Sequence, residues 1–442
     1  MVVLLATLAL LWALTPTLPQ GRIAPGVRIA GRPVGGMTPN QAAAVVSRAA
    51  LSALGPIRLD IPTLDRHLMI LAPELGLRPD TSGPVQAAMR LGRSPNPLVA
   101  AWQRWLARRG AYRIPLQWRL DTRKCRLALG EIAGKVNRRP RSARARWDGS
   151  GIVVTPEAPG IVLRVEDSLQ RVAEWNAAGR VGSLTLAAGQ AEPEVTAADL
   201  APVDGVVARY TTHVGGTANR LSNVRQAASA INGVVVMPGR RFSYNRIVGP
   251  RTTEAGYKTA PVIVRGKMVT GIGGGACQVS STLYNAVLLA NLRVVRRTPH
   301  SHPIGYVPAG QDATVVYGAI DLVFENQGET PVVLQSALQG RRLTILVLGK
   351  TAGPPVRVFS TRRRVAPAAP VLKPDPTLAP GQRVLETKAS SGARTVTYRV
   401  VGDRREVVSR DYYPPTRAVY RVGPAPAPGQ AAPEAPEPGG SE

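Results

Sequence analysis

The chain of 442 residues is long enough for about three domains. Hydrophobic residues make up 44% of it, which excludes a chain that is disordered throughout, and its 44 glycines and 40 prolines fall short of low-complexity composition. With 56 Lys and Arg against 28 Asp and Glu, the net charge is +28. Such a charge favours an anionic partner: nucleic acid, anionic lipid or an anionic wall polymer.

Residues 1–21 give the sequence evidence for the cellular location of the protein. Residues 2–14 form an apolar run that is too short for a membrane span, which needs about 20 residues, but suits the core of a signal peptide. Because no basic residues precede the run, we leave open a cleaved signal peptide, a short membrane anchor and a buried N-terminal element. We expect an extracytoplasmic protein at the cell envelope, secreted or membrane-anchored, that faces an anionic wall or membrane surface.

Residues 22–202 alternate helix-like and strand-like patterns, so we expect an α+β region. Thr38 stands where a helix N-cap is expected, and Gln41 completes a capping box. Two β-rich runs, residues 152–155 and 161–163, flank a turn and predict a strand–turn–strand unit.

After residue 202 the sequence pattern changes twice, first to that of a second α+β domain and then to that of a short strand-rich module. The runs 331–334 and 343–348 flank a turn and predict a hairpin, and the alternation in 395–400 and 405–413 predicts two further strands. We therefore predict an α+β multidomain chain with the following parts: residues 1–21, a signal peptide or short membrane anchor; 22–202, an α+β region; 203–350, an α+β domain; 351–380, a linker; 381–423, a small all-β module; and 424–442, a disordered tail.

The richest motif is the run GIGGGACQVSSTLYNA at residues 271–286. A glycine loop ends at Cys277, and the spacing of the following apolar residues predicts a helix that begins there. A thiol at a helix N-terminus lies near unpaired N–H groups and the positive end of the helix dipole, which stabilise a thiolate. The N–H groups of Gly274 and Gly275 can form an oxyanion hole, which Gln278 can join.

A histidine motif and an aspartate follow. In an extended segment His300 and His302 share a face but lie about 6–7 Å apart, so we expect only one to reach Cys277. Cysteine, histidine and aspartate are the residue types of a thiol-acyltransferase triad. We predict His300 as the base and Asp312 as the residue that orients it, with Asp321 as a substitute for Asp312.

Other interpretations of these residues remain open. A buried cysteine is commonly a small apolar packing residue, and a glycine run is often a flexible turn. In an exported protein Cys125 and Cys277 can form a disulfide. A zinc site of Cys277, His300, His302 and Asp312 matches none of the usual ligand sets, so we predict no metal and no cofactor. His67 and His213 match no motif.

Four polar residues upstream are candidate substrate ligands. They are Asn223, Arg225, Ser243 and Asn245. Arg225 can hold a carboxylate through two parallel hydrogen bonds. Equally, such side chains can cap helices and satisfy buried backbone groups, which we favour for Asn245.

From about residue 205 to 350, an ordered series of motifs resembles the VanW domain. The motifs are NRLSNVR (219–225), FSYN (242–245), VGPR (248–251), GGGACQVSSTLYNA (273–286), PHSHPIGYVP (299–308) and QDATV (311–315). Some members of this family are understood to be peptidoglycan L,D-transpeptidases that use the motif cysteine. The resemblance implies that Cys277 is the nucleophile and that His300 is the matching histidine. Ser281-Thr282 departs conservatively from the common Thr-Thr pair.

The flanking regions resemble wall-associated modules. Residues 22–202 resemble a peptidoglycan-binding domain that often precedes VanW domains, through the segments at 26–39, 72–80 and 156–163. Residues 381–423 resemble the five-glycine domain called G-five, with four glycines in place: Gly381, Gly392, Gly402 and Gly423. These resemblances imply binding to peptidoglycan stem peptides and glycan.

Two functions compete. The first is an exported L,D-transpeptidase that forms a cysteine thioester with a stem peptide, and with water as acceptor the same residues would make a carboxypeptidase or amidase. The alternative is a non-catalytic peptidoglycan-binding scaffold or accessory factor in glycopeptide resistance. Because no DNA-binding motif is present, we expect no nucleic-acid partner.

Overall fold

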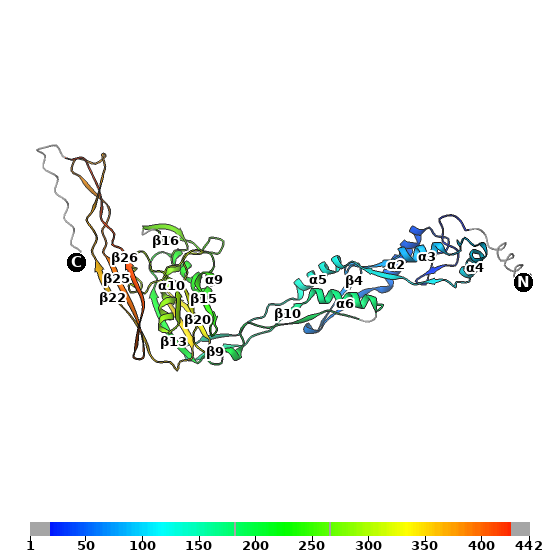
Figure 1. Ribbon diagram of the computed structural model, residues 1–442, viewed down its shortest axis with the longest axis horizontal. Coiled ribbons are helices and arrows are strands. Elements are labelled where there is room, and N and C mark those ends of the chain that lie inside the picture. Colours follow the sequence, from blue (N-terminus) through cyan, green and yellow to red (C-terminus); the bar gives the residue numbers. More distant parts are fainter. Residues whose placement is uncertain (1–17, 181–182, 265–266, 426–442) are drawn as a thin grey trace, which may run out of the picture. The chain divides into compact units, whose positions relative to one another are not determined.

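The computed structural model describes residues 18–180, 183–264 and 267–425 (Figure 1). They form two compact units, one of residues up to 141 together with 158–193, and one of residues 142–157 together with 194 onward. The predicted signal or anchor core and nearly all of the predicted tail lie outside the described residues. Within the described residues, no helix is long and apolar enough to cross a bilayer.

The first unit has two hydrophobic cores. In one, α2 packs with α3, and Thr38 and Gln41 form the predicted capping box at the start of α2. In the other, α5 and α6 pack with the sheet β11-β3-β4. The elements are β1 (Arg28–Ile29), β2 (Arg32–Pro33), α2 (Pro39–Leu54), β3 (Pro56–Ile61), η1 (Pro62–Leu64), β4 (Arg66–Leu71), β5 (Leu77–Asp80), α3 (Ser82–Arg90), α4 (Pro97–Arg108), β6 (Arg113–Ile114), β7 (Gln117–Leu120), α5 (Thr122–Val136), β10 (Gly160–Leu163), α6 (Val165–Ala177), β11 (Leu184–Thr185) and β12 (Ala188–Ala191).

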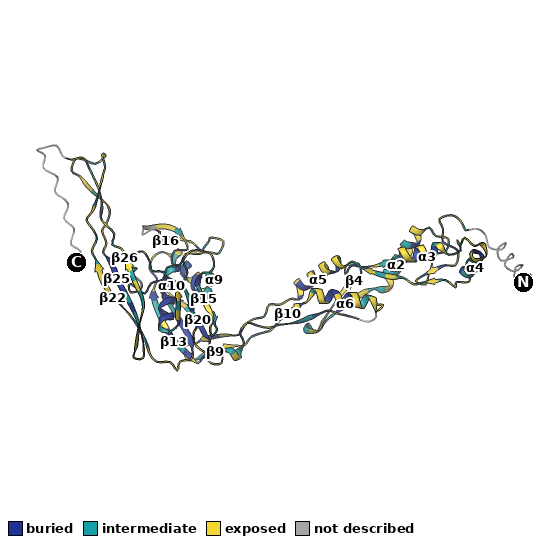
Figure 2. Cartoon of the chain, viewed as in Figure 1, coloured by how far each residue is buried: buried dark blue, intermediate teal, exposed yellow. Residues whose placement is uncertain are grey.

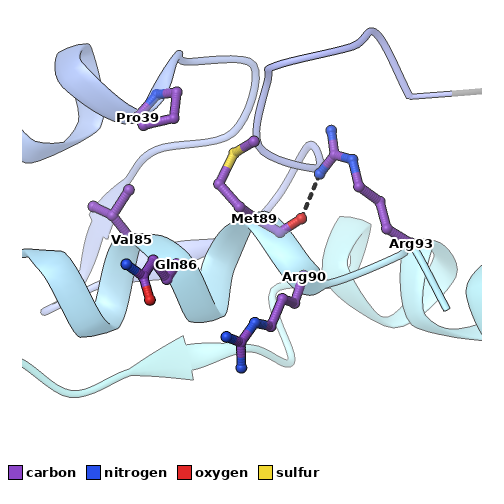
Figure 3. Close-up of a pocket in the computed structure, with 6 residues that line it drawn as sticks. All are labelled: Pro39, Val85, Gln86, Met89, Arg90 and Arg93. Atoms are coloured by element: carbon purple, nitrogen blue, oxygen red, sulfur yellow. Dashed lines mark hydrogen bonds between the residues drawn. The ribbon is translucent and has the colours of Figure 1, made fainter.

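A pocket lies beside α3 in this unit (Figure 3). Its lining residues are Pro39, Val85, Gln86, Met89, Arg90 and Arg93. Arg93 Nη1 donates a hydrogen bond to the carbonyl oxygen of Met89 at 2.6 Å, which fixes one wall. None of the predicted site residues lines this pocket.

The second unit is built on the antiparallel sheet β13-β21-β20-β14, against which α8 and α10 pack. The predicted hairpin is confirmed as β20 and β21. The elements up to the end of this sheet are β8 (Arg144–Trp147), β9 (Ile152–Thr155), α7 (Ala197–Leu200), β13 (Gly205–His213), α8 (Ala218–Ile231), β14 (Val235–Val236), β15 (Arg241–Ser243), α9 (Tyr244–Val248), β16 (Thr259–Val264), β17 (Lys267–Ile272), α10 (Ala276–Leu289), β18 (Arg293–Arg296), β19 (Val323–Glu325), β20 (Val332–Gln339) and β21 (Arg342–Gly349).

The C-terminal strands of this unit form two three-stranded sheets, β22-β25-β26 and β23-β27-β24, which confirms an α+β chain with an all-β end. They are β22 (Val356–Val365), β23 (Val371–Pro374), β24 (Arg383–Thr387), β25 (Gly392–Val401), β26 (Arg404–Tyr413) and β27 (Val419–Val422). We call residues 356–422 the C-terminal β-module. The predicted linker 351–380 is therefore wrong for residues 356–365 and 371–374, because β23 pairs with β27 and β22 pairs along its whole length with β25. Its apolar residues alternate with polar and arginine residues, and the Pro/Ala-rich stretch that follows masked this strand pattern.

The predicted strand–turn–strand unit is also wrong in its pairing. Both strands form, but β9 pairs with β8 and β10 pairs with β12. The chain passes from the second unit to the first between them, at residues 157–158. The turn residues mark a break between strands, whereas distant residues determine which strands pair.

Helix α10 is buried along most of its length (Figure 2), so core substitutions in it should be costly. Leu283 has no exposed surface, and Leu283→Ala should lower the free energy of unfolding by about 2–5 kcal/mol through lost burial and a residual cavity. Val295→Ala is the control, because Val295 is 40% exposed and should change it by under about 0.5 kcal/mol. Calorimetry of the full chain should show a lower transition for the second unit alone. Equal effects of the two substitutions would contradict this core.

Candidate active site

Cys277 lies in the first turn of α10, as predicted. Gly275 is the N-cap residue with φ +114°, a left-handed conformation that favours glycine, and a Cβ there would meet Val224 Cγ2 at 2.9 Å. A Cβ on Gly274 would collide with the carbonyl oxygen of Pro261. Both glycines are therefore required for close packing and the turn that brings Cys277 to the helix start.

The backbone around Cys277 presents free donors. Among the described residues, no hydrogen-bond acceptor is found for the N–H groups of Gly274, Gly275 and Cys277. Unpaired N–H groups at a helix N-terminus suit an anion or a developing oxyanion. The predicted oxyanion role of Gly274 and Gly275 stays a prediction, to which Cys277 N–H adds a donor.

The structure brings Cys277, His300 and Asp312 together. His300 Nδ1 lies 2.6 Å from Asp312 Oδ2, and the backbone N–H of His300 donates to the same oxygen at 2.6 Å. Because Nδ1 is engaged, the other ring nitrogen is left to hydrogen-bond Cys277. The thiol also points at the carbonyl oxygen of Val315, with Sγ and O 3.6 Å apart. The imidazole of His300 is thus hydrogen-bonded to the Asp312 carboxylate on one side and coupled electrostatically to the Cys277 thiol on the other.

The electrostatics favour a thiolate–imidazolium pair. Burial raises the pKa of the Cys277 thiol, but its hydrogen bond to His300 and the charge of His300 outweigh burial, so the pKa is lowered overall. Burial lowers the pKa of His300, but the bonds to Asp312 and Cys277 reverse this effect and raise it to about 9. Burial likewise opposes ionisation of Asp312, while His300, Arg297 and Tyr413 hold its pKa below the ordinary value.

Sequence reasoning missed three residues around Asp312: two of them bond its carboxylate, and the third bonds one of those two. Arg297 Nη2 lies 3.1 Å from Asp312 Oδ1, and the hydroxyl of Tyr413 donates to the same oxygen at 2.5 Å. Arg297 Nη1 lies 2.6 Å from Asp411. The sequence could have indicated Arg297, because it stands three residues before His300. It could not have indicated Asp411 and Tyr413, because they belong to another module and match no motif near Asp312.

Polar residues of α10, the helix that carries Cys277, connect to the Asp312 segment. Ser280 Oγ donates to the carbonyl oxygen of Ala313 at 2.7 Å, and the N–H of Ala313 donates to Ser281 Oγ at 2.9 Å. Asn285 Nδ2 donates to the carbonyl oxygen of Gln311 at 2.7 Å. These bonds explain why a buried helix face carries hydroxyl and amide groups: they fix the backbone on both sides of Asp312.

The predicted substrate ligands Asn223 and Gln278 serve the scaffold instead. Buried Asn223 donates to the carbonyl oxygens of Lys258 and Gly274 at 2.8 and 3.0 Å, which anchors the glycine loop. The amide of Gln278 accepts from Arg220 and donates to Thr212 Oγ1 and the carbonyl oxygen of His213. A fully used, buried amide has no hydrogen bond left to offer an oxyanion.

Ser243 and Asn245 are also structural in this arrangement. Ser243 caps α9 and donates to Asp321, and Asn245 Nδ2 donates to two backbone carbonyl oxygens. Asp321 accepts from both residues, so it is not the substitute orienting carboxylate. Arg225 is exposed on α8, and within the described chain no contact places it at Cys277. Its predicted role is unsupported.

The structure also bears on the two remaining interpretations of Cys277, a disulfide and a zinc site. Cys125 and Cys277 are both free, so they form no disulfide. No cluster of three or more metal-ligating side chains occurs within the described residues, and the ring of His302 lies 3.4 Å from the Ser301 hydroxyl.

The comparisons with known proteins agree with the predicted domain order. Residues 69–179 match the family model of a peptidoglycan binding domain, 219–348 that of VanW like protein and 360–425 that of the G5 domain. The chain carries a VanW-like domain. All three members of the candidate triad lie within it.

Individual relatives match this domain in part. The chain is 40% identical over 163 residues to YoaR of Bacillus subtilis (strain 168), covering 37% of this chain and 52% of YoaR. It is 34% identical over 113 residues to the Vancomycin B-type resistance protein VanW of Enterococcus faecalis (strain ATCC 700802 / V583), covering 24% and 41%. The chain thus spans about half the length of these relatives. An IgA1 protease G5 domain structure matches with 18% identity and a TM-score of 0.14, over 16% of this chain and 89% of that domain.

The pH dependence of alkylation tests the ion pair. Because its pKa is lowered, Cys277 should react with iodoacetamide at lower pH than an ordinary thiol, since only the thiolate is nucleophilic. Cys125 is an internal control: burial raises its pKa to about 11, so it should stay unlabelled near neutral pH. In His300→Ala the groups that most strongly lower the pKa of Cys277 are lost while burial still raises it, so the labelling curve of Cys277 should move to higher pH. Site-resolved mass spectrometry measures both curves, and an ordinary curve for Cys277 would contradict the pair.

Proposed function

We propose that this chain is an exported cell-wall L,D-transpeptidase that acts through Cys277 on peptidoglycan stem peptides. The observation that carries the proposal is the chain of contacts from a thiol at a helix N-terminus, through His300, to buried Asp312. A non-catalytic scaffold has no need for a thiol with a lowered pKa or for a buried carboxylate behind its histidine.

The flanking domains support the cell wall as the place of action. One matching model describes a peptidoglycan binding domain, and the relative from Enterococcus faecalis is named Vancomycin B-type resistance protein VanW. The net charge of +28 complements an anionic wall or membrane surface. The partners we propose are peptidoglycan stem peptides and glycan.

The proposed reaction divides one amide exchange into two steps. The Cys277 thiolate attacks the carbonyl carbon after the third stem residue, a C–S bond forms, and free N–H groups at Gly274, Gly275 and Cys277 stabilise the oxyanion. The C–N bond then breaks, and the proton of the His300 imidazolium passes to the departing D-amino acid. In the second step His300 takes a proton from an amine of a neighbouring stem, whose nitrogen attacks the thioester and releases the thiolate. Water as acceptor would instead give a carboxypeptidase.

Incubation with a stem tetrapeptide and mass analysis tests this reaction. The intact enzyme should gain the mass of an acyl group on Cys277 and release a D-amino acid. Cys277→Ala and His300→Ala should each abolish turnover, and the double substitution should cost little more, because nucleophile and base act as a unit. Asp312→Asn should reduce turnover less completely, since the orienting group assists the base without replacing it.

Two substitutions serve as matched controls. His302→Ala should be mild because His302 bonds only a neighbouring hydroxyl, and Cys125→Ala should leave turnover unchanged because Cys125 is a buried free thiol of the first unit. Full cross-linking by Cys277→Ser, or no acyl-enzyme with any stem peptide, would leave the binding scaffold as the better function.

A further inference from the structure

The C-terminal β-module contacts the segment that carries Asp312. Thr397 Oγ1 of β25 donates to the carbonyl oxygen of Gly310 at 3.0 Å, and Gln311 Nε2 donates to Ser360 Oγ of β22 at 3.1 Å. Gly310 has φ +90°, and a Cβ there would meet Thr397 Oγ1 at 2.6 Å, so the side-chain hydroxyl of Thr397 lies as close to the Gly310 backbone as glycine allows. The contact therefore depends on the residue types of both the Gly310 segment and the C-terminal β-module.

Tyr413, at the end of β26, reaches furthest into the site. Its hydroxyl accepts a hydrogen bond from the N–H of Gly310 at 2.8 Å and donates to Asp312 Oδ1 at 2.5 Å. Because the Gly310 N–H occupies its lone pair, the hydroxyl hydrogen is directed at the carboxylate. Burial raises the pKa of Tyr413, so the residue stays a neutral donor at physiological pH.

The hydrogen-bond donors around Asp312 are shared between the two oxygens of its carboxylate. His300 uses Oδ2 for both its backbone N–H and its ring, whereas Arg297 and Tyr413 use Oδ1. Arg297 is itself held by Asp411 of β26 at 2.6 Å. With both oxygens occupied, the carboxylate cannot rotate without breaking a charge-assisted bond.

We infer that the C-terminal β-module is a working part of the active site, in which Tyr413 is a positioning residue that orients Asp312 and, through it, His300. This inference rests on the proposed function only in taking the triad as the reacting group. The module then has a second role besides any wall contact. Side chains far along the chain from Asp312 complete the site: Tyr413 lies 101 positions after Asp312.

Titration of His300 in the full-length protein tests this inference without requiring turnover. The chain has four histidines, so an isotope-labelled histidine NMR spectrum is simple to assign with His300→Gln. In the unmodified protein His300 should titrate near pH 9. Tyr413→Phe keeps the ring and removes the hydroxyl that fixes Asp312, so His300 should titrate about one unit lower, and Cys277 alkylation at neutral pH should fall about fivefold.

Tyr412→Phe is the matched control. Tyr412 is the preceding residue of the same strand, points to the opposite face and is 52% exposed. It should change neither the titration nor the alkylation. Thr397→Val, which releases Gly310 without touching Asp312, should shift His300 in the same direction by less and covers the case in which Tyr413→Phe does not fold. The titratable groups around His300 and Asp312 are Cys277, Tyr284, Arg297, Tyr306, Asp411 and Tyr413.

The outcomes separate this inference from the proposed function. A His300 titration that is the same in Tyr413→Phe, Thr397→Val and the unmodified protein would overturn the positioning role, whatever the enzyme does. A shifted His300 with no acyl-enzyme would support the positioning role and leave the transpeptidase reaction refuted.

Discussion

Burial of the Asp312 carboxylate is the constraint on which the site depends. A charge removed from water is tolerated only when hydrogen bonds and opposite charge replace its hydration. Here His300, Arg297 and Tyr413 supply these, so the neighbours of Asp312 cannot vary independently. The same arrangement raises the pKa of His300, which in turn lowers that of Cys277. The reactivity that we propose for the Cys277 thiol thus depends on the carboxylate of Asp312, which acts on the thiol through His300.

Helix α10 combines three functions in one segment. Its N-terminus presents Cys277, its apolar side chains such as Leu283 fill the core, and its hydroxyl and amide groups hold the backbone around Asp312. A serine in a helix interior usually competes with the helix's own hydrogen bonds. Ser280 and Ser281 do donate to the carbonyl oxygen of Cys277 within the helix, but their hydroxyl groups also bond Ala313 outside it and so link the helix to the Asp312 segment.

Polar motif residues near a reactive group need not contact substrate. Asn223 holds the carbonyl oxygen of Gly274 and therefore shapes the loop before Cys277, while Ser243 and Asn245 bind Asp321. Such residues accompany Cys277 because the glycine turn that precedes it must be fixed from several sides. Their chemical type alone does not distinguish support from binding, since both uses require the same hydrogen bonds.

The sequence by itself determined what depends on local chemistry. The capping box of α2, the β20–β21 hairpin and the start of α10 at Cys277 follow from neighbouring residues, and the order of motifs indicated Cys277, His300 and Asp312. Only the tertiary structure decided the partners: that β9 pairs with β8, that β22 is a strand rather than linker, and that Asp411 and Tyr413 support Arg297 and Asp312 in the candidate site. These depend on contacts between residues far apart in the chain, which no local pattern of turns or hydrophobic spacing specifies.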